Sequence, residues 1–292
     1  MKTHTVVVLA FLLTLPVSAS AAAQRPPCPA TPGVPASEDV ARGDCLFHST
    51  KAFGQDPNGP FVSCATCHYG SEKTDHGVHL IQVTNAVGET VDVLRKTTSL
   101  LKAQTNFPYG WDGRFATVQE AAQAAILSPV EMRGTSVDKD QLDALAAFVL
   151  SLGPAAPVSA PAPPSVGTLE RIALGRTVFF GKGTCVTCHA EPDFTNHAIT
   201  TNQVHLSFTG TTDLGAAFVG TGGVAEFKVP SLLFFNSDRP FMHNGALAKD
   251  DQLVRFYNES LGLGLNSREL TGLQYWLRNC LDPRREPKPG TC

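Results

Sequence analysis

Two stretches of the chain, near residues 145 and 275, place apolar residues along one face of a helix. Each stripe repeats at intervals of three and four residues: Leu142, Leu145, Phe148 and Val149 in the first, and Leu270, Leu273, Trp276 and Leu277 in the second. This spacing predicts two amphipathic α-helices. Few other segments alternate in the manner of a half-buried strand. The pattern therefore predicts a mainly α-helical, loop-rich protein.

The start of the chain carries a short apolar run, residues 6–15, between the charge of Lys2 and the small residues 21–23. These three features are typical of a secretory signal peptide. The run is too short to span a bilayer, and no second run follows. We expect residues 1–23 to be a signal peptide, cleaved after Ala23. The mature protein is then periplasmic or otherwise exported, without a membrane span.

The remaining chain divides into two similar parts. A Pro/Ala/Ser-rich stretch, residues 154–166, is expected to be a semi-rigid linker. It separates an amino-terminal domain, residues 24–153, from a carboxy-terminal domain, residues 167–292. Arg42-Gly43 is expected to open a helix in the first. Five positions of the first part recur at constant spacing in the second: Lys96, Ser99, Leu100, Leu101 and Gly113 match Lys228, Ser231, Leu232, Leu233 and Gly245. This repeat predicts two small domains of common origin.

Charge gives no sign of a polyanionic partner. The chain has 23 Lys and Arg against 26 Asp and Glu, a formal net charge of −3, and the basic residues form no run. Neither a nucleic acid nor a membrane surface is therefore expected as a partner.

Cysteine usage suggests both disulfides and a bound group. Of the eight cysteines, four belong to two Cys-x-x-Cys-His motifs. The others, Cys28, Cys45, Cys280 and Cys292, are expected to form disulfides, which persist in oxidising compartments. Sequence proximity favours Cys28–Cys45 and Cys280–Cys292, and a Cys28–Cys292 bridge between the termini is the alternative.

The two motifs, Cys64-Ala65-Thr66-Cys67-His68 and Cys185-Val186-Thr187-Cys188-His189, have the spacing of c-type haem attachment. The cysteines form thioethers to the porphyrin, and the histidine supplies its imidazole to the iron. A zinc site made of the four cysteines would leave both histidines without a role. A redox dithiol would need a strand–helix context that is not evident. Two covalently bound haems are therefore predicted.

Further segments in both halves resemble one family. Trp111-Asp112-Gly113-Arg114, then Ser128-Pro129-Val130-Glu131-Met132, are similar to segments of the bacterial di-haem cytochrome c peroxidases and the MauG-type enzymes. In the second half the similar segments are Phe227-Lys228-Val229-Pro230-Ser231-Leu232 and Pro240-Phe241-Met242-His243-Asn244-Gly245. The resemblance covers roughly residues 40–281.

The resemblance implies a division of labour between two c-type cytochrome domains. The haem on His68 would react with hydrogen peroxide, and the haem on His189 would transfer or store electrons. Trp111 would lie between the haems, and Glu131 would be the acid/base group above the first. Electrons would come from a small exported protein, a cytochrome c or a cupredoxin. Two other functions stay open: a MauG-like oxidase of a protein or organic substrate, and a plain di-haem electron carrier.

Several positions depart from the family pattern. Ala121 and Ala125 stand where the family often has glutamine and proline, so the pocket beside Glu131 is expected to be less polar. A histidine often binds the first haem in the resting peroxidases, and His76 and His79 are the candidates here. Both could equally be surface residues.

The family's calcium ion is expected to be absent or altered. Lys96 replaces an asparagine that helps to hold it, and a cation there would repel calcium. An ion pair between Lys96 and Asp238 is expected to join the domains instead; two unrelated surface charges are the alternative.

Two residues could supply the sixth ligand of the His189 haem. Tyr257 stands where the peroxidases have a methionine ligand and the MauG-type enzymes a tyrosine. Met242 adjoins His243 and is the alternative. Position favours Tyr257, which would stabilise the ferric and higher oxidation states, whereas a thioether would raise the reduction potential. Core packing could also account for either side chain.

Overall fold

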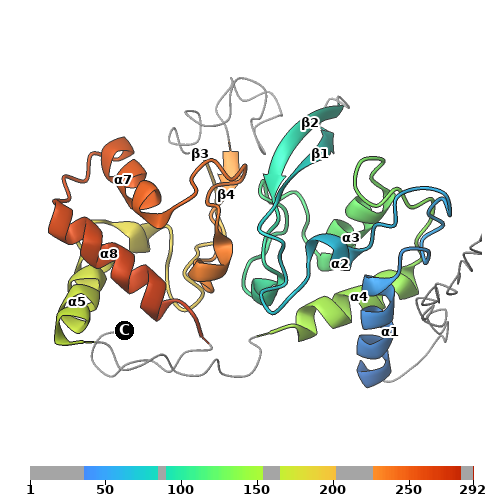
Figure 1. The fold of residues 1–292 in the computed structure, drawn as a ribbon, viewed down its shortest axis with the longest axis horizontal. Coiled ribbons are helices and arrows are strands. Elements are labelled where there is room, and N and C mark those ends of the chain that lie inside the picture. The colour runs from blue at the N-terminus through green and yellow to red at the C-terminus, as the bar shows by residue number, and fades with distance from the viewer. Residues whose placement is uncertain (1–35, 85–89, 154–164, 202–225, 284–291) are drawn as a thin grey trace, which may run out of the picture.

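The computed structural model describes residues 36–84, 90–153, 165–201, 226–283 and 292. The chain forms two lobes side by side (Figure 1), the amino-terminal lobe of residues 36–153 and the carboxy-terminal lobe of residues 165–292. The expected signal peptide and most of the expected linker lie outside the described residues. Within the described part of the chain, no helix is long and apolar enough to cross a membrane.

Helices dominate both lobes, as the apolar stripes predict. The amino-terminal lobe contains α1 (Ala36–His48), α2 (Cys64–Cys67), β1 (Val78–Thr84), β2 (Thr90–Lys96), α3 (Val118–Leu127) and α4 (Lys139–Ser151). The carboxy-terminal lobe contains α5 (Val166–Phe180), β3 (Ile199–Thr201), β4 (Glu226–Lys228), α7 (Asp250–Ser260) and α8 (Ser267–Cys280). Short 3₁₀ helices lie at Leu100–Lys102, Cys185–Thr187 and Phe235–Asp238. Helix α4 carries the first predicted stripe and α8 the second.

Each lobe has its own hydrophobic core. In the amino-terminal lobe, Phe47 of α1 and Leu145 of α4 are almost fully buried. In the carboxy-terminal lobe, Phe179 of α5 and Trp276 of α8 are equally buried, and their rings pack 4.4 Å apart. The long helices begin at side-chain caps, such as Thr117 for α3 and Asn266 for α8. These caps bond the first amide groups of each helix, which have no partner within it.

A glycine allows the main helices of each lobe to approach closely. A Cβ atom added to Gly43 in α1 would overlap the carbonyl group of Ala144 in α4. In the same way, a Cβ atom at Gly175 in α5 would overlap the carbonyl group of Gly272 in α8. Gly43 therefore lies in the middle of α1, and the prediction that Arg42-Gly43 opens a helix was wrong. The glycine is there for helix packing, which local pattern alone does not show.

The Gly175→Ala substitution is expected to destabilise the carboxy-terminal lobe by about 1–3 kcal/mol or more, because the backbones of α5 and α8 must move apart. Chemical denaturation followed by circular dichroism would measure the loss. Gly167→Ala in the same helix is the control, since a Cβ atom there meets nothing within 4 Å. Equal stability of the two variants would contradict this account of the helix contact.

The hairpin of β1 and β2 is a feature that the sequence pattern did not predict. The strands pair antiparallel, from Val78 opposite Lys96 to Thr84 opposite Thr90. Val83 and Val93 are buried, but Leu80 and Leu94 are exposed. Because apolar side chains occupy both faces, the strands lack a clean alternation of apolar and polar residues.

Contacts between the lobes occur in pairs: a contact from the first lobe to the second has an equivalent contact from the second lobe to the first. The Lys96 amide donates to the His243 carbonyl at 2.7 Å, and the Lys228 amide donates to the Trp111 carbonyl at 2.9 Å. His76 Nδ1 donates to the Arg239 carbonyl at 3.0 Å, and His197 Nδ1 to the Phe107 carbonyl at 2.8 Å. Two lysines add contacts that are not related by the repeat: Lys102 Nζ donates to the Ser231 carbonyl, and Lys228 Nζ to those of Asn106 and Pro108. The sequence repeat thus extends to the backbone and histidine contacts between the lobes.

One predicted disulfide is present. Cys280 is bonded to Cys292, in agreement with the pairing by proximity and against a Cys28–Cys292 bridge. Cys45 is also disulfide-bonded. Its predicted partner, Cys28, lies outside the described residues.

Candidate functional site

Both Cys-x-x-Cys-His motifs adopt tight helical turns. The first forms the four-residue helix α2, whose entry is fixed by Ser63 and Thr66. The second forms a 3₁₀ turn over Cys185–Thr187. The four motif cysteines are free thiols. Within each motif, a single turn therefore brings the two sulfurs and the following histidine to neighbouring positions, as predicted.

The two motif histidines are held in the same way. His68 Nδ1 donates to the Lys73 carbonyl at 3.2 Å, and His189 Nδ1 donates to the Phe194 carbonyl at 3.0 Å. Lys73 and Phe194 both have positive φ angles, 52° and 51°, so the loops turn identically. Such a bond from one ring nitrogen fixes the tautomer and leaves Nε2 as the metal-binding nitrogen. Burial lowers the pKa of His68, and it lowers that of His189 to about 4. Both rings are therefore neutral at physiological pH, as ligation requires.

A cavity of about 590 Å³ lies against the first motif. All three motif residues, Cys64, Cys67 and His68, line it. Its walls are mainly apolar and include Phe47, Leu100, Val118, Val130, Met132 and Leu145. An apolar cavity with a few polar groups is typical of a site for a large flat cofactor.

The thiol pKa values argue against a redox dithiol. Burial raises the pKa of Cys64 to about 12 and that of Cys185 to about 11. Burial also raises the pKa of Cys67, with a contribution from the charges of Asp75 and Glu131. Redox-active cysteines instead have lowered pKa values.

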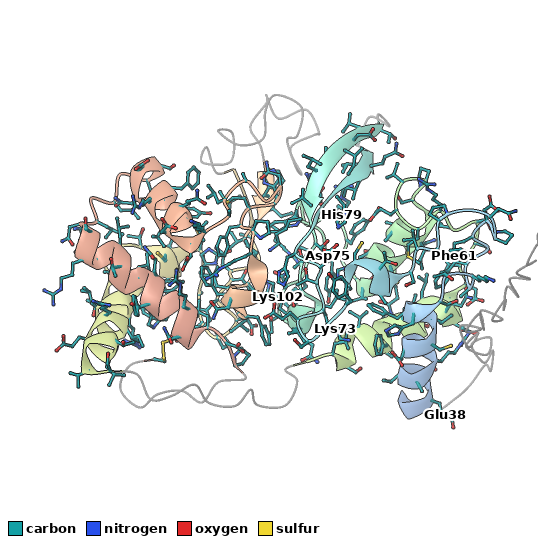
Figure 2. The ribbon with its side chains drawn as sticks, viewed as in Figure 1. Glu38, Phe61, Lys73, Asp75, His79 and Lys102 are labelled. Atoms are coloured by element: carbon teal, nitrogen blue, oxygen red, sulfur yellow. A yellow bond between two sulfur atoms is a disulfide. The ribbon has the colours of Figure 1, made fainter. Side chains whose placement is uncertain are left out.

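Four cations line the cavity: Arg95, Lys96, Lys102 and Lys228. Their exposed fractions are only 6%, 3%, 1% and 5%. Figure 2 shows Lys102 where the two lobes meet. Buried cations at one wall of an apolar cavity match a ligand that is apolar over most of its surface and carries acidic groups at one edge. A haem, with its two propionates, is such a ligand. The thiols, the neutral histidine, the apolar walls and the buried cations therefore all fit this group.

The wall made by α3 and the following loop carries Glu131. This carboxyl is partly buried, and Ala121 and Ala125 lie in the same wall. Burial raises the pKa of Glu131, although a hydrogen bond from Ser128 and the charges of Arg114 and His79 act in the opposite direction. Because the alanines add no polar atoms, the carboxyl faces a low-polarity space, as the sequence predicts. A carboxyl with a raised pKa is suited to both taking up and releasing a proton.

Trp111 joins the cavity to the second lobe. Its ring lines the cavity, and its Nε1 donates to the Lys96 carbonyl at 2.9 Å. Its own carbonyl accepts from the Lys228 amide. The Lys96 ammonium lies 5.7 Å from the centre of the Trp111 ring, a cation–π contact. Trp111 is thus bonded to both lobes.

The two candidates for the sixth ligand differ in their surroundings. Met242 is buried in the core of the carboxy-terminal lobe, with a positive φ angle of 73°. Burial raises the pKa of Tyr257 to about 12, and the nearby thiols of Cys188 and Cys185 add to the shift. Tyr257, on α7, therefore lies near the second motif. Met242 belongs to the core cluster against which Cys185 packs, so the preference for Tyr257 stays a prediction.

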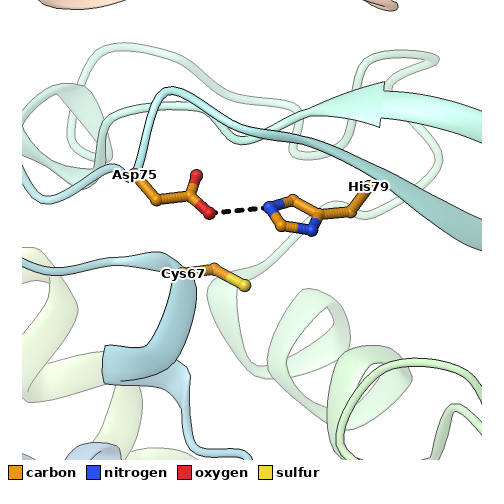
Figure 3. A group of neighbouring side chains, drawn as sticks. All are labelled: Cys67, Asp75 and His79. Atoms are coloured by element: carbon orange, nitrogen blue, oxygen red, sulfur yellow. Dashed lines mark hydrogen bonds and ion pairs between the residues drawn. The ribbon is translucent and has the colours of Figure 1, made fainter.

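The two histidines considered as ligands have other partners. His76 Nδ1 is bonded across the interface to Arg239, and its Nε2 lies 3.0 Å from a carboxylate oxygen of Glu72. It does not line the cavity and belongs to the interface. His79 does line the cavity, but its Nε2 is bonded to Asp75 (Figure 3). The sequence did not indicate Asp75, His197 or Lys102, because their roles depend on contacts between distant segments.

Of the ion pair expected in place of calcium, the structure describes only the Lys96 side chain. Lys96 is buried against Trp111, in agreement with a cation at that position. The side chain of Asp238 lies outside the described residues, so the ion pair stays a prediction.

An ion pair anchors the helix that carries Tyr257. Asp250, at the start of α7, accepts two hydrogen bonds from the Arg278 guanidinium of α8. Burial acts to raise the pKa of Asp250, but Arg278 and the charge of Arg239 outweigh it, so the pKa is lowered. A carboxyl of this kind stabilises the fold above its unfolded pKa of about 3.9, and the stabilisation is lost as pH falls through the lower, folded value.

The Asp250→Asn substitution is expected to lower the free energy of unfolding by about 1–3 kcal/mol at pH 7, since hydrogen bonds to charged groups are lost. The difference from wild type should shrink below about pH 4, where the unfolded carboxyl is protonated. Denaturation at several pH values, with Asp251→Asn as control, would measure both effects. A difference that does not change with pH would contradict the ion pair.

The comparisons with known proteins agree with this site. The sequence profile of the di-haem cytochrome c peroxidases, the CCP_MauG family, matches residues 37–151. The methylamine utilization protein MauG of Methylorubrum extorquens is 26% identical over 255 residues, which are 75% of this chain and 68% of that protein. The cytochrome-c peroxidase IdrP2 of Denitromonas iodatirespirans is 25% identical over 290 residues, covering 80% and 76%.

Solved structures show the same fold. A MauG-like protein associated with microbial copper homeostasis aligns with a TM-score of 0.65 at 17% identity, over 89% of this chain and 95% of that one. The diheme peroxidase BthA from Burkholderia thailandensis aligns with a TM-score of 0.59 at 16% identity, over 84% and 86%. The profile match and the curated relatives thus show that this chain is similar to the di-haem cytochrome c peroxidases and the MauG proteins.

Proposed function

We propose that this protein is an exported di-haem c-type peroxidase, which reduces hydrogen peroxide with electrons from a small exported electron-transfer protein. One haem is attached through Cys64, Cys67 and His68, and the other through Cys185, Cys188 and His189. The observation that carries the proposal is Glu131, a carboxyl with a raised pKa in the wall of the cavity that the first motif lines. A plain electron carrier has no use for such a group.

The residues of the chain have distinct tasks in this reaction. A haem with an open position supplies the redox chemistry that splits the O–O bond. Glu131 takes the proton from one peroxide oxygen and returns it to the other, the leaving oxygen. The apolar walls exclude water, and the Lys73 and Phe194 carbonyls hold the two histidines in place. Trp111 provides a bonded connection between the lobes along which electrons reach the first motif.

A second function, a MauG-like oxidase of a protein or organic substrate, is favoured by one observation. Tyr257 lies close enough to the second motif for the charges of Cys188 and Cys185 to raise its pKa, and a phenolate ligand would stabilise oxidised iron. An oxidised haem pair would then withdraw electrons from a substrate at the surface.

Stopped-flow mixing with hydrogen peroxide, with and without a reduced cytochrome c or cupredoxin, separates these functions. Rapid oxidation of the donor is expected for the peroxidase. A long-lived oxidised haem pair that ignores the donor would support the MauG-like oxidase instead. Two low-spin haems that do not respond to peroxide would contradict both enzymes and support the carrier.

A further inference from the structure

A second acid–base pair, Asp75 and His79, lies in the same cavity as Glu131. His79 is on β1, and its Nε2 lies 2.7 Å from Asp75 Oδ2. The other oxygen of Asp75 accepts from the Gly77 amide at 2.8 Å, which fixes the carboxylate. A carboxylate can only accept here, so Nε2 of His79 carries the hydrogen. Nδ1 is then the nitrogen that can take up a further proton.

The pair stands between the cavity and the solvent. His79 lines the cavity, and 44% of its side chain is exposed, whereas 14% of the Asp75 side chain is exposed. Figure 3 shows both side chains beside the sulfur of Cys67, and the ligand atoms of all three lie within 4.8 Å of one another. The charge of His79 lowers the pKa of Glu131, and the charges of Asp75 and Glu131 raise that of Cys67. Glu131 therefore lines the same cavity as His79, within electrostatic range of it.

Cys67, Asp75 and His79 also have the ligand types of a metal site. In the haem-loaded protein, however, the Cys67 sulfur would be a thioether to the porphyrin. It could then no longer act as an anionic thiolate ligand. The Asp75–His79 pair remains, with a free nitrogen and access to solvent.

The stoichiometry of peroxide reduction requires a supply of protons from solvent. One hydrogen peroxide, two electrons and two protons give two molecules of water. Glu131 can move a proton from one peroxide oxygen to the other, but this supplies no new protons. The electrons come from the donor protein, and both protons must come from solvent. A partly buried carboxyl in an apolar wall needs a partner that exchanges protons with solvent.

We propose that His79, oriented by Asp75, exchanges protons between the solvent and Glu131, an inference that rests on the proposed peroxidase function. His79 Nδ1 takes a proton from water and passes it to the Glu131 carboxylate, which delivers it to a peroxide-derived oxygen. Two such transfers accompany each peroxide reduced. His79 acts through Glu131 and is not itself a ligand of the iron.

The test uses the haem-loaded His79→Gln variant, whose amide can still bond Asp75 but cannot exchange a proton. Turnover with peroxide and a reduced cytochrome c is expected to fall by about 10²-fold. Added imidazole should restore part of the lost rate, and the visible spectrum of the resting protein should not change. The control is His48→Gln: His48 pairs with Asp44 at the same spacing of four residues, at 3.1 Å, but does not line the cavity. It should keep the wild-type rate and show no response to imidazole.

Four results would overturn the inference, and they can be told apart. If His79→Gln turns over at the wild-type rate, His79 carries no required proton. If its resting spectrum shifts from six- to five-coordinate iron, His79 is an axial ligand. If wild-type protein does not consume peroxide at all, the proposed function fails, and the inference fails with it. A lowered rate that imidazole does not restore would assign His79 a purely structural role.

Discussion

The Glu131→Gln variant is expected to react with hydrogen peroxide about 10²–10⁴-fold more slowly than wild type. The amide keeps the size and polarity of the side chain but cannot take up and return a proton. Haem content and resting spectra should be unchanged, because Glu131 is neither a cysteine nor a histidine of the motifs. Stopped-flow absorbance at increasing peroxide concentration gives the second-order rate constant.

Two further variants sharpen this measurement. Glu131→Asp keeps the acid but withdraws it from the cavity, so an intermediate rate is expected. Glu170→Gln changes an exposed carboxyl of α5 and should have no effect. An unchanged rate constant in Glu131→Gln would remove this residue from the mechanism, whatever the behaviour of His79→Gln.

The Tyr257→Phe variant is expected to raise the reduction potential of the second haem by roughly 100 mV or more, a fraction of the ~0.8 V over which axial ligands set haem potentials. Removing a phenolate removes the ligand that favours ferric iron. Spectroelectrochemical titration of both haems would show the shift in one potential only.

Near-infrared spectra decide between Tyr257 and Met242. The ferric wild-type protein should lack a methionine–iron charge-transfer band, and Met242→Leu should change only packing in the core. Tyr275→Phe is the matched control, since the Tyr275 hydroxyl is bonded to Arg171 on the surface. A band that survives in Tyr257→Phe and disappears in Met242→Leu would show that Met242 is the ligand.

The parts of the structure that depend on neighbouring residues could be predicted from the sequence. The helical stripes of α4 and α8 are local patterns, and the motif residues Cys64, Cys67 and His68 lie within one turn. Their place in a cavity with Glu131 followed from the family resemblance, because these segments are more than sixty residues apart. The Cys280–Cys292 bridge followed from proximity.

The parts that depend on tertiary contacts could not be predicted. Gly43 gives no local sign that it packs against another helix, so the sequence pattern alone favours a helix that opens at this residue. His76 bonds a carbonyl of the other lobe, a contact that no spacing indicates. The role of Asp75 depends on its hydrogen bond with His79, which the sequence does not indicate. The strands of the hairpin could not be predicted because their exposed apolar residues break the alternation of apolar and polar positions.

The interface between the lobes has a consequence for how such a chain could have arisen. The backbone contact and the histidine contact that one lobe makes are each returned by the other, and this is the form of an isologous interface between identical subunits. A single-motif ancestor could therefore have worked as a homodimer before the two copies became one gene. In a homodimer every substitution appears on both sides of the axis. Fusion removes that constraint, so Trp111 and its counterpart His243 were free to become different residues.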